Sequence, residues 1–248
     1  MQEIEQDDEG TPTGDEGDAS APEAAEEVPD PGPPHARSLP GYLTERYRRW
    51  RASRFEEDRA WYARLAIDGQ HPRAMVIQCC DSRFNVVDMF GAEPGDLFIV
   101  RNIASLVPPY GPDHNHHGTS AAVEFAVNVL HVAHIVVVGH SGCGGVGACH
   151  DMCAGLAPEL EKTSSFIGRW MDILRPGYER VAARVEDEAE RRTALEHEAI
   201  LVSLENLETF PFVREAREAG MLTLHGCWFD IGTGSLLTFS PESGFTSV

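Results

Sequence analysis

The first 36 residues contain no lysine or arginine, although 12 of the chain's 40 acidic side chains lie there. Residues 37–248 hold 28 acidic and 20 basic side chains, so they contribute −8 to the net charge of −20. Neither part offers the basic face that a nucleic-acid-binding protein needs. Because the first segment also has few large apolar side chains, we expect residues 1–37 to be a disordered acidic tail. It either keeps the chain in solution or docks a protein partner.

The chain also lacks an apolar run long enough to cross a membrane. The segments AAVEFAVNVL and HIVVV are among its longest apolar stretches, and both are too short for a bilayer. The start, MQEIEQDDEG, is acidic and polar, unlike a secretory signal. We therefore expect a cytoplasmic protein without membrane contact. In that compartment the six cysteines stay reduced, which favours metal binding or burial over disulfides.

Apolar periodicity predicts an α/β fold in a single domain over residues 38–248, with a mainly parallel sheet of about four to five strands. Because strands alternate with helices, both faces of this sheet are expected to be covered by helices. Residues 40–67 predict an N-terminal helical arm, a long amphipathic helix with room for one break, whose aromatics suggest packing on a partner subunit. Strands are expected at 74–79, 96–102, 134–140, 221–231 and 235–241, and helices over 117–132, 164–175 and about 186–219.

Two short motifs, CCDSR and GHSGC, follow predicted strands and carry metal-ligating side chains. Cys79 ends the first strand, His140 ends the third, and Cys143 lies at the start of a helix. Since functional sites gather at the carboxyl edge of parallel strands, these three side chains could converge. Two thiolates and one imidazole suit Zn²⁺ and leave a fourth position for water. Taken singly, each cysteine could equally be a buried packing residue.

In an extended chain Cys79, Asp81 and Arg83 would face the same way. Asp81 then has two possible roles: to accept a hydrogen bond from a metal-bound hydroxide, or to act as a conditional fourth metal ligand. Arg83 could hold that carboxylate by a two-pronged salt bridge. The remaining cysteines are expected to be buried small residues: Cys80, Cys149, Cys153 and Cys227.

Other patterns leave a choice between a functional and a structural role. Cys149 and Cys153 are four residues apart on a predicted helix, so a second metal there is an alternative to burial. The loop with His114, His116 and His117 could shuttle protons, or it could be an exposed loop without a role.

Two further patterns favour a structural role. Arg101 and Asn102 could touch substrate, but we favour backbone hydrogen bonding and interface support. Gly142, Gly144 and Gly147 satisfy G-x-G-x-x-G, yet no second strand with an acidic end follows, so dinucleotide binding is not expected.

The pattern C-x-D-x-R followed by H-x-x-C resembles that of β-class carbonic anhydrases. GAEPGDLFIVRNIASLVPPY, GTSAAVEFAV, IVVVGHSGCGGV and LTLHGCWFDIGTGSL also resemble the family, so the resemblance covers about residues 40–241. It implies zinc, one ion per subunit, and reversible hydration of CO2 to bicarbonate. It also implies a homodimer or higher homo-oligomer with active sites at subunit interfaces. Two rivals remain: hydrolysis of CS2 or COS on the same fold, and a non-catalytic scaffold recruited through the acidic tail.

The resemblance is closer to the plant-like branch of this family, because Gln70 matches a glutamine nine residues before the first ligand. Val76 stands where the other branch has a tryptophan of an inhibitory bicarbonate site. We therefore expect an open site with Asp81 off the metal. In the family the glutamine comes from the neighbouring subunit, and Phe125 replaces a frequent tyrosine. The implied substrate contacts are Gln70, Gly144 and an apolar pocket of Phe98, Ile103 and Phe125.

Overall fold

The computed structural model describes residues 37–112 and 117–248. They belong to two compact units whose boundary lies between Ser53 and Arg54. The expected acidic tail lies almost wholly outside the described residues. In the first unit the described part is chiefly α1, Gly41–Trp50, in which no residue is buried. Tyr42 and Tyr47 are 61% and 55% exposed. The aromatic side chains of this helix are therefore exposed.

The expected long helix of the arm is interrupted. A π-helical turn, Arg51–Phe55, follows α1, and α2 begins only at Arg59 and ends at Asp68. Within the second unit α2 is anchored by Trp61, whose indole N–H donates to the Pro94 carbonyl at 3.1 Å. None of the described helices is long and apolar enough to span a bilayer.

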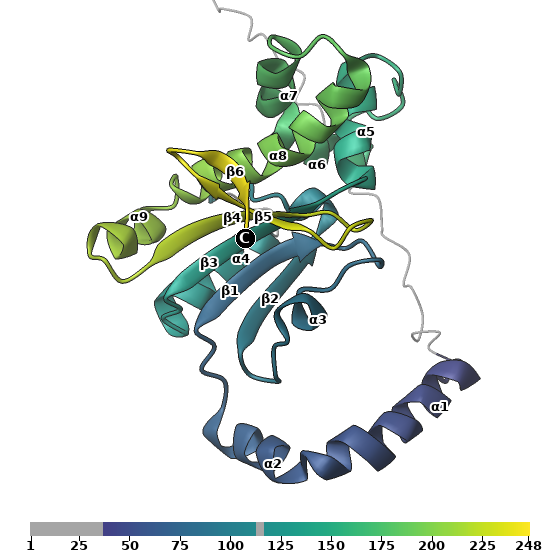
Figure 1. The fold of residues 1–248 in the computed structure, drawn as a ribbon, viewed down its shortest axis with the longest axis vertical. Coiled ribbons are helices and arrows are strands. Elements are labelled where there is room, and N and C mark those ends of the chain that lie inside the picture. The colour runs from purple at the N-terminus through teal and green to yellow at the C-terminus, as the bar shows by residue number, and fades with distance from the viewer. Residues whose placement is uncertain (1–36, 113–116) are drawn as a thin grey trace, which may run out of the picture. The chain divides into compact units, whose positions relative to one another are not determined.

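The described residues form one six-stranded sheet in the order β2-β1-β3-β4-β5-β6 (Figure 1). The first four strands in this order are parallel, and β5 and β6 are antiparallel. The mainly parallel fold is confirmed, with one strand more than the upper number expected. The strands are β1 Ala74–Cys79, β2 Leu97–Asn102, β3 His134–His140, β4 Thr223–Phe229, β5 Leu236–Ser240 and β6 Gly244–Ser247.

Helices cover the two faces of the sheet unequally. On one face Met75, Ile77 and Val137 pack in a core with residues of α4 (Gly118–Glu124), α8 (Glu188–Leu207) and α9 (Pro211–Glu218). On the other face Val76 and Val138 pack with Val86 of the short α3, Val86–Phe90. Of the described helices, only this one contributes to the second core.

A group of helices lies beyond the carboxyl ends of the strands, where Figure 1 shows α5, α6 and α7 together. Their buried side chains form a third core that includes Cys79 and Cys143. α7 was not expected from the sequence; its proline lies in the first turn, where proline is tolerated. The helices of this group are α5 Gly144–Cys153, α6 Phe166–Met171 and α7 Arg175–Ala182. Elsewhere in the fold, a π-helical turn, Phe125–Val129, continues α4.

Candidate metal centre

Three side chains distant in sequence meet at the carboxyl edge of the sheet. Cys79 is the last residue of β1 and His140 is the last of β3, the strand beside it. Cys143 is the N-cap residue of α5. All three are buried, with exposed fractions of 5%, 1% and 6%. Their ligating atoms lie within 4.8 Å of one another, so the convergence predicted from the sequence is confirmed.

The geometry and donor set of this cluster fit zinc. The two sulfur atoms of Cys79 and Cys143 are 3.8 Å apart. Two sulfurs bound at about 2.3 Å to a tetrahedral Zn²⁺ would be about 3.8 Å apart. His140 Nδ1 donates to the Ser141 carbonyl at 3.1 Å, while Nε2 is buried without a partner among the described residues. This tautomer leaves the Nε2 lone pair free for a metal.

The two cysteines perturb each other's pKa. Their contact lowers the pKa of Cys79, against the effect of burial. The same contact, together with burial, raises the pKa of Cys143, so the two thiols titrate as a pair. A metal ion binds cysteine as thiolate, so binding would displace the thiol protons.

Asp81 and Arg83 lie in a turn after β1 and not in an extended strand, so the predicted strand alternation is wrong. The expected salt bridge between Asp81 and Arg83 is nevertheless present. Asp81 Oδ1 accepts from the Arg83 backbone N–H and Nε at 2.9 Å each, and Oδ2 accepts from Nη2 at 2.7 Å. The Arg83 guanidinium holds the pKa of Asp81 far below its usual range. Asp81 Oδ2 lies 3.9 Å from His140 Nε2, so an ionised carboxylate faces the cluster.

Arg101 fixes the turn that carries Asp81. Its Nε donates to the Cys79 carbonyl at 3.0 Å, and its Nη2 donates to the carbonyls of Asp81 at 2.7 Å and Phe84 at 3.2 Å. This is the backbone role favoured from the sequence. Arg83 Nη2 also donates to the Gly142 carbonyl at 2.9 Å and so links this turn to the loop before Cys143.

Glu196 on α8 is a residue of the centre that the sequence did not point to. Its Oε1 accepts from the backbone N–H of Gly142 at 2.7 Å and of Cys143 at 3.3 Å. Its Oε2 accepts from the Trp228 indole N–H at 3.1 Å. Burial raises its pKa, and these bonds oppose that effect. Glutamate at a helical position more than 50 residues from the ligands gives no local signal, and only the fold brings it there.

Ile103 is held beside α5 by a strained turn. Ala104 and Ser105, which follow it, have φ values of 63° and 58°, a left-handed conformation that costs energy for residues other than glycine. The Ser105 hydroxyl donates to the Val138 carbonyl at 2.7 Å and stabilises this turn. A Cβ on Gly145 would lie 2.5 Å from Ile103 Cγ2, so only glycine allows this close approach. Ile103 is 37% exposed at the edge of the metal centre.

The predicted substrate residues separate into two groups within one chain, so the pocket expected from Phe98, Ile103 and Phe125 is not formed by a single subunit. Phe98 pairs with Met75 while Cys79 pairs with Asn102. Four residues of strand, about 13 Å, therefore separate Phe98 from the metal edge.

The other predicted contacts divide between the same two ends of the sheet. Phe125 stacks on Phe98 with ring centroids 5.9 Å apart, away from the metal edge. Gln70 is exposed and precedes the amino end of β1. Gly144, the first residue of α5, stays at the metal edge with Ile103.

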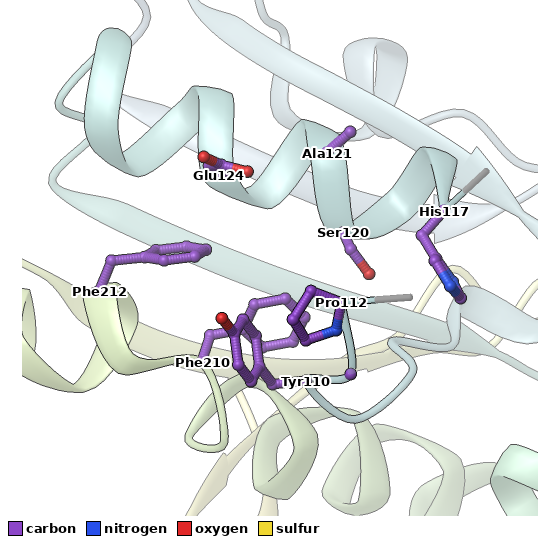
Figure 2. A pocket seen from close by; sticks show the side chains of 9 residues that line it. Tyr110, Pro112, His117, Ser120, Ala121, Glu124, Phe210 and Phe212 are labelled. Atoms are coloured by element: carbon purple, nitrogen blue, oxygen red, sulfur yellow. The ribbon is translucent and has the colours of Figure 1, made fainter. Parts of the chain in front are cut away.

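Three cavities lie near these elements. One of about 620 Å³ borders Cys143 and Glu196, and one of about 490 Å³ borders Ile103 and Trp170. The third, about 230 Å³, lies between α4 and the aromatic rings of Tyr110, Phe210 and Phe212, with His117 at its rim (Figure 2). The metal ligands do not line this third cavity.

The remaining predicted residues have mixed outcomes. His114 and His116 lie outside the described residues. Cys149 and Cys227 are buried, as expected. Cys153 is only partly buried, and Cys80 is exposed. The prediction for Cys80 is wrong because the chain leaves the sheet at that residue and turns toward solvent.

A buried Cys-His-Cys centre at the carboxyl edge of a parallel sheet, with an ionised carboxylate beside it, defines a metalloenzyme site. Comparison with known proteins agrees. The sequence profile of the carbonic anhydrase family matches residues 74–236. The chain belongs to this family and is a β-class carbonic anhydrase.

Named relatives show the extent of this similarity. Beta carbonic anhydrase 3 of Arabidopsis thaliana is 35% identical over 188 residues, 75% of this chain and 71% of that protein. Beta carbonic anhydrase 5, chloroplastic, of the same plant is 36% identical over 193 residues, 76% of this chain and 60% of that protein. The structure of the β-carbonic anhydrase CcaA matches with a TM-score of 0.74 and 30% identity, covering 84% of this chain and 98% of CcaA. A tetrameric β-carbonic anhydrase of Sordaria macrospora matches with a TM-score of 0.68 and 29% identity, covering 83% and 97% of the two chains.

Proposed function

We propose that this enzyme hydrates CO2 reversibly to bicarbonate with one Zn²⁺ held by Cys79, His140 and Cys143. The observation that carries the proposal is the orphaned, buried Nε2 of His140 facing two sulfurs at the spacing of zinc ligands. A bound Zn²⁺ supplies the Lewis acidity that makes water a nucleophile near neutral pH. Neither CS2 or COS hydrolysis nor a scaffold role is favoured by any described feature.

Asp81 would orient the attacking water. Its Oδ1 is fully engaged by Arg83, whereas Oδ2 makes one bond to Arg83 and faces His140. Oδ2 can therefore accept a hydrogen bond from an O–H of the attacking water. This bond would point the lone pair of the water oxygen toward the carbon of CO2. Because Arg83 holds both oxygens, we propose that Asp81 stays off the metal and that the site is open, as in the plant-like branch.

The substrate pocket would need a second copy of the chain. Ile103 lies at the metal edge, whereas Gln70, Phe98 and Phe125 lie toward the amino ends of the strands and cannot reach their own metal centre. A homo-oligomer in which one chain's Gln70 and aromatic pair approach the other's Ile103 would complete an apolar pocket with one amide donor. The exposed aromatics of α1 support assembly in the same way. The relative from Sordaria macrospora is tetrameric by name.

Two properties of the whole chain complete the proposal. The six cysteines are free, which suits the expected reducing cytoplasm. One relative is chloroplastic by name, and that location belongs to the relative. A protein partner for residues 1–36 stays a prediction from charge alone.

The direct test is stopped-flow CO2 hydration on purified protein whose zinc content has been measured. We expect about one zinc per chain and turnover that rises with pH, since the nucleophile must lose a proton. Zinc-loaded protein without CO2 turnover at alkaline pH would rule out the proposed reaction. The same sample assayed with CS2 and COS separates the rival substrates.

A further inference from the structure

His134, Thr223 and His225 bring a second set of metal-ligating atoms together at the amino ends of the parallel strands. His134 begins β3, and Thr223 begins β4 and pairs with it in the sheet register. His225 is two residues further along β4, so the three side chains leave the same face of the sheet. The spacing of the two imidazoles is thus fixed by backbone hydrogen bonds between two neighbouring strands.

The two imidazole nitrogens of this cluster have the spacing of two ligands to one ion. His134 Nδ1 lies 2.7 Å and His225 Nε2 lies 2.8 Å from Thr223 Oγ1. The two nitrogens are 3.3 Å apart. Two imidazole nitrogens bound at about 2.05 Å to a tetrahedral Zn²⁺ would be about 3.3 Å apart. Binding would therefore need no movement of the strands.

Without an ion, the three close contacts cannot all be hydrogen bonds. If His134 donates to the hydroxyl and the hydroxyl donates to His225, no proton remains for the nitrogen–nitrogen contact. Partial desolvation and the neighbouring His134 lower the pKa of His225, which favours the neutral imidazole that a metal ion needs. A cation bound by both nitrogens would turn their close contact, which lacks a proton, into two coordination bonds.

We propose that this cluster is a second metal site, for Zn²⁺ or another divalent cation that prefers imidazole. His134 Nδ1 and His225 Nε2 are the ligands, the Thr223 hydroxyl is a weak third, and solvent completes the coordination. Six residues of β3, about 20 Å, separate His134 from His140, so the site is distinct from the cysteine centre. His225 is exposed, and an ion there exchanges with solvent and links β3 to β4.

The test is a calorimetric titration of Zn²⁺ into protein that already holds one zinc per chain. We expect a second equivalent to bind to the wild type and to lose that binding in His134→Gln and in His225→Gln. The matched control is His71→Gln, since His71 is also an exposed histidine and its Nε2 lies 3.0 Å from the Asp68 carbonyl, away from the cluster. This control should keep the second equivalent. Retained CO2 hydration in each variant shows that the fold is intact.

The same titration with Co²⁺ gives a readout that separates imidazole from thiolate ligands. We expect the second Co²⁺ to add only weak visible bands. An intense thiolate charge-transfer band would place the second ion on a cysteine, such as the exposed Cys80, and would overturn the proposal. It is also overturned if the wild type binds no second equivalent, or if both histidine variants still bind one.

Discussion

The two ends of the parallel strands differ in how complete they are within one chain. At the carboxyl end every functional side chain has a supporting contact: Arg83 holds Asp81, Ser141 orients His140, and Glu196 holds the loop before Cys143. At the amino end Gln70 is exposed and Phe125 is 41% exposed. One end is thus a preorganised candidate metal centre, and the other leaves Gln70 and Phe125 exposed to solvent.

This difference suggests separate requirements for binding the metal and for forming the substrate pocket. Metal ligands must be rigid, and these lie at two strand ends and at the start of a helix, which the core fixes. Pocket walls can come from another subunit, because apolar contacts require less exact geometry than coordination bonds.

Loss of one metal ligand should have the largest effect. Cys143→Ala removes one of three protein ligands and leaves the sulfur of Cys79 without its partner. We expect zinc content near zero and no CO2 hydration, measured by metal analysis and stopped flow. Cys80→Ala is the matched control, because this neighbouring cysteine is exposed and outside the cluster. A zinc-free result for both variants would mean that general instability, not ligation, causes the loss.

Asp81→Asn should separate metal binding from catalysis. The amide keeps the size of the carboxylate but cannot accept both Arg83 bonds and the nucleophile's proton. We expect zinc to stay bound and kcat/KM to fall about 100-fold, the typical weight of such a positioned group. Asp88→Asn, an exposed carboxylate on α3, should leave the rate unchanged. An unchanged rate in Asp81→Asn would contradict the orienting role.

Mixing two defective chains tests whether the amino end serves a second subunit. Gln70→Ala alone should slow hydration about tenfold, the cost of one lost hydrogen bond to substrate. When it is mixed with Cys143→Ala, a two-fold dimer regains intact sites in roughly a quarter of positions. Activity should then exceed the average of the two parents. In the control, Gln70→Ala is mixed with the double variant that carries both changes. Recovered activity in this control mixture would argue against sites built from two subunits. So would the absence of recovered activity in the first mixture.

Glu196→Gln should loosen the metal with little effect on folding. The amide oxygen can still accept from the backbone N–H groups of Gly142 and Cys143. The amide NH2 would then face the Trp228 indole N–H, donor against donor. We expect zinc to leave to a chelator about tenfold faster, as for other groups that orient metal ligands. Glu198→Gln is the control two residues along α8. It breaks ion pairs with Arg180 and Arg184, so it should lower the stability to denaturant without changing the rate of zinc loss.

Much of the fold follows from local sequence signals. β1 and β3 are short runs of buried Val, Ile and Met, and Cys79, His140 and Cys143 stand where those strands end, so strand prediction and ligand chemistry agree. β6 was missed because its four residues, GFTS, have no apolar pattern, and it exists only by pairing with β5.

The parts of the site that were missed depend on tertiary contacts. Asp81 and Arg83 were paired correctly for the wrong reason, since a turn and not strand alternation brings them together. Glu196 reaches the centre only because α8 packs across β3 and β4. The separation of Phe98 from Ile103, by contrast, could have been predicted, because most of β2, Leu97–Asn102, extends between them along the chain.

Deletion of residues 1–36 should have the smallest effect. It removes 12 acidic side chains and no basic ones, so the net charge changes from −20 to −8. CO2 is uncharged, and therefore its approach to the metal centre gains nothing from the field of these charges. We expect kcat/KM for CO2 to stay within twofold at both low and high salt, since screening alters only the encounter of charged species. A collapse in activity would show that residues 1–36 belong to the folded site and support the metal centre at the carboxyl ends of the strands.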